Sequence, residues 1–181
     1  PSSAGCFAST WCKVRRGATK RGRILLRGRN VVGESDPQSP AVCHRVVLDT
    51  NIVLDLWVFQ DAACIPLHAD LTSGALQWIA TAPMRDELAR VLAYPQIVRS
   101  LAHHRIAADD VLREFEQRAM QVAVAAKAAV TCKDPDDQKF MDLAVTHQCL
   151  LLSKDNAVLC MKKRLSALGV TVAAAYDVAA K

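Results

Sequence analysis

Four short apolar runs divide residues 45–175 of this 181-residue chain. They are RVVLD (45–49), ALQWIAT (75–81), CLLLS (149–153) and VTVAAA (170–175), and segments with a helical pattern lie between them. Apolar runs of this length are typical of strands that are buried on both faces of a parallel sheet. Helices that connect such strands cover both sides of the sheet. The sequence therefore predicts an α/β fold with a central, mainly parallel sheet.

The helices are predicted from their breaks, their caps and the spacing of their apolar residues. Pro83 can open a helix that stops before Pro95, because proline is tolerated only in the first turn. Asp109 is expected to cap a helix whose core stripe extends from Val111 to Val122. The predicted helices cover residues 52–59, 83–94, 110–126, 138–147 and 157–168.

Positive charge is concentrated at the start of the chain. Residues 1–45 contain nine Lys or Arg and two acids, whereas the remaining residues contain 14 basic and 16 acidic side chains. Residues 1–43 are rich in Gly, Ser, Arg and Lys without a sustained period, which predicts a disordered basic arm. The arm is either a nucleic-acid tether or a non-native extension. Residues 44–181 are expected to form one domain, which is the size that such a length favours.

Cysteine usage and hydropathy indicate the compartment. The seven cysteines (6, 12, 43, 64, 132, 149 and 160) are scattered, and none forms a C-x-x-C pair. This pattern favours reduced thiols over a disulfide framework or a zinc site. No stretch approaches the roughly 18–20 apolar residues that cross a bilayer, and the N-terminus lacks the apolar core of a secretory signal. We expect a cytoplasmic protein without a membrane span.

The segment KDPDDQKFMDLA (133–144) places Asp134, Asp136 and Asp137 directly before a predicted helix. One interpretation is that these carboxylates cap the helix and interact with its positive end. The other is that one or more of them face a metal ion, because carboxylates this close disfavour each other's ionisation unless a cation offsets them. Helical spacing places Asp137 above the buried face of its helix and Asp142 about 140° away, where it is expected to be solvated.

Three further acids occupy positions that suit a shared site. Asp49 ends the first predicted strand and Asp155 follows the third, so both lie at the edge of a parallel sheet where ligands bind. Glu87 lies beside the buried stripe of its helix, where a carboxylate needs either a basic partner or a cation. For Asp49, capping of the next helix is the alternative. If the four acids converge, their oxygen atoms would select Mg²⁺ or Mn²⁺ over softer metals.

Four segments carry a resemblance to a known family. VVLDTNIVL, APMRDELARVLAYP, KDPDDQKFMDLAV and LLLSKDNAVL resemble, in order and spacing, the PIN-domain nucleases, and in particular the branch of toxin components of toxin–antitoxin systems. The resemblance covers residues 45–178. It implies a PIN-like three-layer α/β/α sandwich and a ribonuclease that depends on Mg²⁺ or Mn²⁺. It also implies an RNA substrate, a small antitoxin protein as inhibitor, and a homodimer.

The resemblance also assigns roles to individual residues. Asn51 matches an asparagine that orients the first acid, and Asp134 and Asp136 match acids that support the metal site. Four cations near the acids are candidates for binding RNA phosphates, with solvated surface charge as the alternative. The catalytic, metal-binding acids that it implies are Asp49, Glu87, Asp137 and Asp155, and the candidate cations are Arg85, Lys133, Lys139 and Lys154.

Two other functions fit the same pattern. A PIN-like module could bind RNA or protein without catalysis, although the complete set of acids argues against it. An α/β phosphatase or phosphoacceptor protein would use the strand-end Asp49 as a nucleophile. Such proteins commonly carry a second acid two residues later, where this chain has Asn51. The sequence therefore favours the nuclease.

Overall fold

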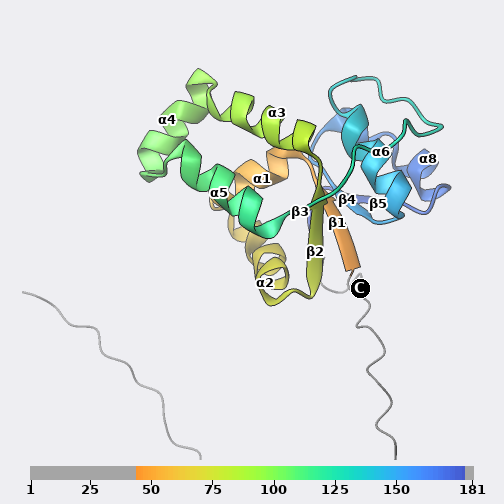
Figure 1. Ribbon diagram of the computed structural model, residues 1–181, viewed down its shortest axis with the longest axis horizontal. Helices are drawn as coiled ribbons and strands as arrows, with labels where there is room; N and C mark the ends of the chain where they lie inside the picture. Colours follow the sequence, from red (N-terminus) through yellow and green to blue (C-terminus); the bar gives the residue numbers. More distant parts are fainter. Residues whose placement is uncertain (1–43, 178–181) are drawn as a thin grey trace, which may run out of the picture. The chain divides into compact units, whose positions relative to one another are not determined.

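The computed structural model describes residues 44–177, which form a five-stranded parallel sheet flanked by helices (Figure 1). The strand order is β3-β2-β1-β4-β5, and Val46 at the centre of β1 pairs with Trp78 on one side and Leu150 on the other. The predicted fold class, an α/β/α sandwich around a parallel sheet, is confirmed. The strands are β1 (His44–Leu48), β2 (Leu76–Ala80), β3 (Met120–Gln121), β4 (Leu150–Leu152) and β5 (Thr171–Ala173).

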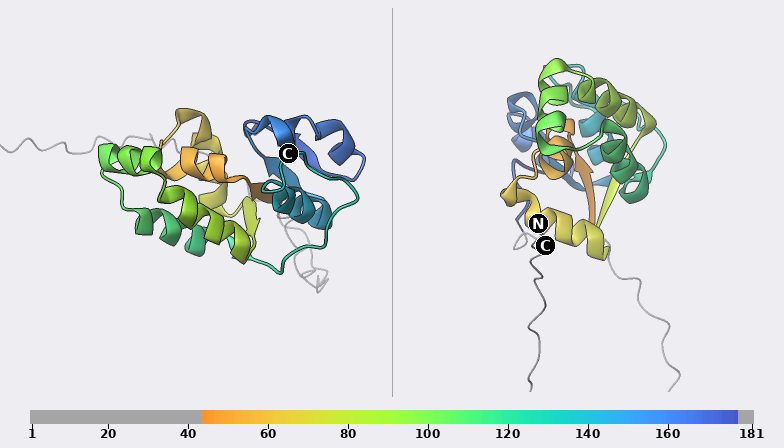
Figure 2. Two further views of the ribbon diagram at one scale, coloured as in Figure 1. Left: turned by 90° about the horizontal axis from the view of Figure 1, so that it is seen from above. Right: turned by 90° about the vertical axis from the view of Figure 1, so that its left-hand side faces the viewer.

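The helices form two groups along the sheet. Helices α3, α4 and α5 lie together on the side of β2 and β3, whereas α6 and α8 lie on the side of β4 and β5 (Figures 1 and 2). Helix α6 packs on β1 and β4, and α8 packs on β5. The helices are α1 (Thr50–Trp57), a 3-10 turn (Ala62–Cys64), α2 (Ile65–Ser73), α3 (Ala82–Leu92), α4 (Pro95–His104), α5 (Ala108–Arg118), α6 (Gln138–His147), α7 (Asn156–Leu159) and α8 (Lys162–Ser166).

One predicted helix is wrong in both its cap and its end. The helix predicted over residues 110–126 begins at Ala108 with Ala107 as its N-cap, and it ends at Arg118. Met120 and Gln121 instead pair with β2 as a short parallel strand. The alanine-rich stretch after it favours a helix locally, but tertiary pairing with the sheet edge overrides that preference. Asp109 therefore lies inside the first turn and not at the cap.

Other differences concern short elements. Helices α2 and α4 were not predicted, and the helix predicted over residues 157–168 is divided into α7 and α8. The five-residue α8 and the four-residue α7 are too short to show a helical period in sequence. The predicted basic arm, residues 1–43, lies outside the described residues.

The core is formed by the strands and by the apolar faces of the helices. Trp78 on β2 stacks on Trp57 with ring centroids 5.4 Å apart and meets Phe115 edge-on at 4.7 Å. Through these aromatic contacts, α1 and α5 pack against the sheet. Within residues 44–177, no single helix is both long and apolar enough to cross a membrane. Helices Thr50–Trp57 and Ala62–Ser73 reach that length together, but a bend of 103° separates them.

Candidate active site

Asp49 lies at the carboxyl end of β1, and its side chain is held by two neighbouring donors. The residue is 4% exposed. Its Oδ2 accepts hydrogen bonds from Asn51 Nδ2 at 2.9 Å and from Ser153 Oγ. Burial raises the pKa of Asp49, and the nearby Glu87 carboxylate adds to this, whereas the hydrogen bonds from Ser153 and Asn51 oppose it. Asp49 also occupies the N-cap position of α1, although its side chain makes no capping hydrogen bond, so its place in the site and its place at the start of this helix coexist.

Glu87 reaches the same edge of the sheet from α3. Its Oε1 accepts a hydrogen bond from Thr50 Oγ1 at 2.9 Å, so the residue after Asp49 orients the second acid. Its Oε2 is buried and accepts no directed hydrogen bond, but it forms an ion pair with the Lys139 ammonium group of α6. The basic partner that the sequence left open for Glu87 is therefore Lys139.

Asp137 precedes α6 and carries the least satisfied carboxylate of the site. It occupies the N-cap position but makes no side-chain capping bond, and its buried Oδ2 has no hydrogen-bond partner. Burial raises the pKa of Asp137 to about 7, with further contributions from the charges of Asp49, Asp155 and Asp134. Side-chain capping therefore does not explain the position of this acid.

The remaining acids lie in turns at the same edge. Asp155 is exposed and caps α7 by accepting a hydrogen bond from the Ala157 N–H at 2.7 Å, while its charge acts on Asp137. Asp134 Oδ1 accepts a hydrogen bond from the Asp136 N–H at 2.9 Å, which shapes the loop before α6. Electrostatic interactions thus connect four acids from separate segments, which we call the acid cluster: Asp49, Glu87, Asp137 and Asp155.

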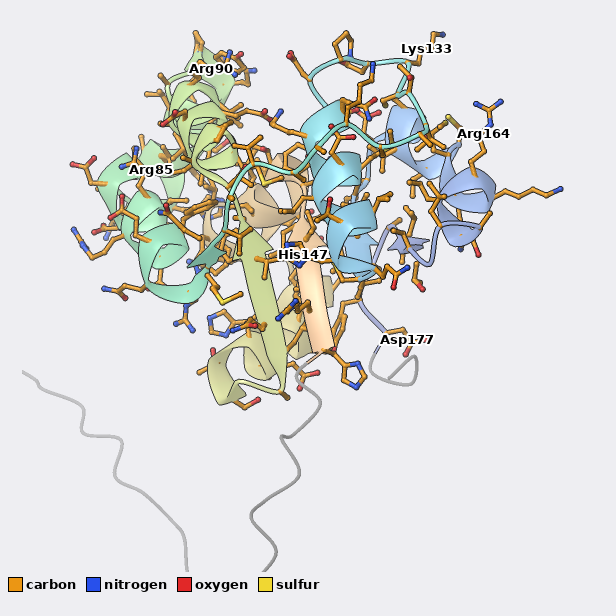
Figure 3. All side chains as sticks on the ribbon, turned by 45° about the vertical axis from the view of Figure 1, so that its right-hand side comes forward. Arg85, Arg90, Lys133, His147, Arg164 and Asp177 are labelled. Atoms are coloured by element: carbon orange, nitrogen blue, oxygen red, sulfur yellow. The ribbon has the colours of Figure 1, made fainter. Side chains whose placement is uncertain are left out.

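The four candidate phosphate-binding cations have different surroundings. Arg85 forms an ion pair with Glu116 at 2.7 Å and lies on the α5 side of the molecule (Figure 3). Lys154 contacts Asp55 at 2.6 Å and Asp61 at 3.4 Å. Lys133 is exposed on the loop before α6 (Figure 3). Lys139 is the one of these four that contacts the acid cluster.

Asp142, predicted to be solvated, is instead buried at 9% exposure. Its Oδ1 accepts hydrogen bonds from the Ala128 N–H at 2.8 Å and from Gln138 Nε2 at 2.7 Å. The prediction was wrong because the irregular segment 122–137 folds over this face of α6, which helical periodicity cannot anticipate. Asp142 therefore anchors the loop that carries the acids.

Two polar residues of the site were missed from sequence, Thr50 and Ser153. Both are buried, and each donates a hydrogen bond to a carboxylate of the acid cluster. Ser153 Oγ also accepts a hydrogen bond from the Asp155 N–H at 3.0 Å, so it connects two of the acids. Each residue is a small hydroxyl side chain within two residues of an acid, which is a partial signal, but the carboxylate that each one contacts is set by tertiary geometry.

Comparison with known families shows to which protein family the chain belongs. A model of the PIN domain family matches residues 45–157, a range that contains every residue of the acid cluster. The chain belongs to the PIN domain family. No curated protein sequence matched it. PIN domains are usually nucleases and generally use divalent metals.

The site of this PIN domain offers oxygen donors that suit a hard cation. Asp137 Oδ2 lacks a partner, and Glu87 Oε2 has only an ion pair. In the described part of the chain, no group of three or more His, Cys, Asp or Glu side chains is arranged to hold one metal ion. The oxygen donors therefore fit Mg²⁺ or Mn²⁺. To bind one ion together, the carboxylates of the acid cluster would have to move closer to one another than they are in this structure.

Proposed function

We propose that this PIN domain is a metal-dependent endoribonuclease that cleaves single-stranded RNA. The observation that carries the proposal is the buried, unpartnered Oδ2 of Asp137, which lies within the electrostatic influence of three other carboxylates. A buried carboxylate without a partner is costly, and a divalent cation would offset that cost. Mg²⁺ or Mn²⁺ is accordingly the proposed cofactor.

Each residue of the site then has a definite task. Asp49, Glu87, Asp137 and Asp155 would hold the cation, which lowers the pKa of water and offsets negative charge on the scissile phosphate. Asn51 and Ser153 fix one oxygen of Asp49, and Thr50 fixes one oxygen of Glu87. Asp134 and Asp136 shape the loop that presents Asp137. Hydrolysis would leave a 5′ phosphate and a 3′ hydroxyl.

We further propose that the protein is the toxin of a toxin–antitoxin pair and acts in the cytoplasm. The support is the order and spacing of the four motifs, which resemble the toxin branch of PIN domains. That proposal implies a small antitoxin protein that blocks the site, and a homodimer. Induced expression of wild type should arrest bacterial growth, whereas Asp49→Asn should not.

The central experiment is cleavage of a labelled single-stranded RNA pool. Wild type and Asp49→Asn are compared with Mg²⁺, Mn²⁺ or EDTA, and a DNA pool of the same sequences tests the substrate class. We expect RNA cleavage that needs metal and is absent in the variant. Folded wild type that binds RNA but cleaves no substrate with either metal would instead favour a catalytically silent binding module.

A further inference from the structure

Lys139 places a positive charge inside the acid cluster. It is the second residue of α6, and its ammonium group contacts Glu87 Oε2 and the backbone carbonyl of Asp136. The side chain is 22% exposed, and that of Glu87 is 15% exposed. The Lys139 charge also lowers the pKa of Asp137, opposing the effect of the carboxylates. One ammonium group therefore acts on two acids that come from different helices.

No other Lys or Arg within residues 44–177 forms an ion pair with a member of the acid cluster. Lys154, the next cation along the sheet edge, is paired with Asp55 and Asp61. The repulsion among the four carboxylates is therefore offset mainly by Lys139. An ammonium group and a divalent cation would compete for the same oxygen, Glu87 Oε2.

We propose that Lys139 is a tethered competitor for the divalent cation. Its ammonium group holds Glu87 Oε2 while the metal is absent, and it leaves that oxygen when the metal binds. This inference rests on the proposed metal-dependent function. The contact is suited to exchange because the lysine stem is flexible and partly exposed. Lys139 is thus a positioning residue that sets the affinity for metal.

The proposal predicts opposite effects of one substitution. Lys139→Met should lower the thermal stability of the metal-free protein, because Glu87 Oε2 loses its partner. The same change should tighten Mn²⁺ binding on the order of tenfold, because the competing charge is gone. Lys139→Arg retains the charge and should bind Mn²⁺ like wild type. A merely structural role would lower stability without tightening metal binding.

Isothermal titration of the full-length, metal-free chain with Mn²⁺ provides the first test. Lys154→Met is the matched control, since it also removes an ion-paired lysine but not one that contacts the acid cluster. We expect only Lys139→Met to bind Mn²⁺ more tightly than wild type does. Equal or weaker Mn²⁺ binding by Lys139→Met relative to Lys154→Met would overturn the inference. If neither wild type nor any variant binds Mn²⁺, the proposed metal dependence is overturned as well.

A second test uses wild type and does not depend on a variant that folds. Trace acetylation of amines, followed by peptide mass spectrometry, measures how reactive each lysine is with and without Mn²⁺. Release of the ammonium group should increase the labelling of Lys139 severalfold when Mn²⁺ is added, while Lys162 on α8 should stay constant. Unchanged labelling of Lys139 by a protein that binds Mn²⁺ would contradict displacement.

Discussion

Asp137 couples the stability of the metal-free protein to pH. Its pKa is about 7 in the folded chain, against an ordinary value of 3.8. The folded state therefore binds more protons than the unfolded state between these values, and its stability falls as pH rises through that range. The free energy of unfolding of Asp137→Asn should equal that of wild type near pH 4 and should exceed it above pH 7. Urea unfolding in EDTA measures the difference, and a difference that shrinks as pH rises would contradict the prediction.

Ser153 is the residue whose hydroxyl group connects β4 to two acids. Ser153→Ala removes a donor to the buried Asp49 carboxylate and an acceptor for the Asp155 N–H. Loss of a hydrogen bond to a charged group predicts a decrease of about 1.5–3 kcal/mol in the free energy of unfolding. Chemical denaturation measures it, with the exposed Ser166→Ala on α8 as control. Equal effects of the two substitutions would show that the Ser153 hydroxyl does not support the site.

At the scale of elements, the sequence predicted the strands that carry an apolar pattern and missed the strand whose position depends only on pairing with a neighbour. The apolar runs gave β1, β2, β4 and β5, because a strand buried on both faces needs continuous apolar residues. Strand β3 is two residues long and exposed, so it has no such pattern. Its place is set by pairing with Ile79 and Ala80 of β2, which no local sequence signal encodes.

The segment 122–137 depends on α6 for its conformation. Gln138 accepts a hydrogen bond from the Cys132 N–H at 2.7 Å and donates one to the Val130 carbonyl at 3.0 Å. Gln138→Ala should therefore increase amide hydrogen exchange in residues 128–134 and reduce RNA cleavage, because Asp137 is no longer held in place. Exchange mass spectrometry tests this, with Gln117→Ala on the exposed face of α5 as control. Exchange in this segment that matches wild type would show that Gln138 is not its anchor.

At the scale of the whole molecule, topology explains why the acids could be placed from sequence. Asp49 and Ser153 follow adjacent strands, β1 and β4, whose carboxyl ends coincide in a parallel sheet. Glu87 and Asp137 reach the same edge from helices that begin there. The sequence could not show which donors face each carboxylate, since the Thr50, Ser153 and Lys139 contacts depend on tertiary geometry. The same limit explains the burial of Asp142.

The uneven charge of the chain predicts how the whole protein binds RNA. Residues 46–181 carry two more acids than basic groups, whereas residues 1–45 carry seven more basic groups than acids. We therefore expect the first 45 residues to supply much of the phosphate contact, while the core of the described domain extends from Val46 to Val172. Arg15, Arg16, Arg21, Arg23, Arg27 and Arg29 can be replaced together by Gln without changing the length.

That variant should unfold at the same temperature as wild type and bind single-stranded RNA more weakly. The dependence of log Kd on log salt concentration should become shallower by about 0.7 for each RNA phosphate that the variant no longer neutralises. Fluorescence anisotropy over a salt series, with Asp49→Asn as the background to prevent cleavage, gives both slopes. Identical slopes would mean that cations of the domain itself, such as Lys133 and Lys154, bind the phosphates. Lys154 would then have to leave Asp55 to reach RNA, because the two are paired at 2.6 Å in the free protein.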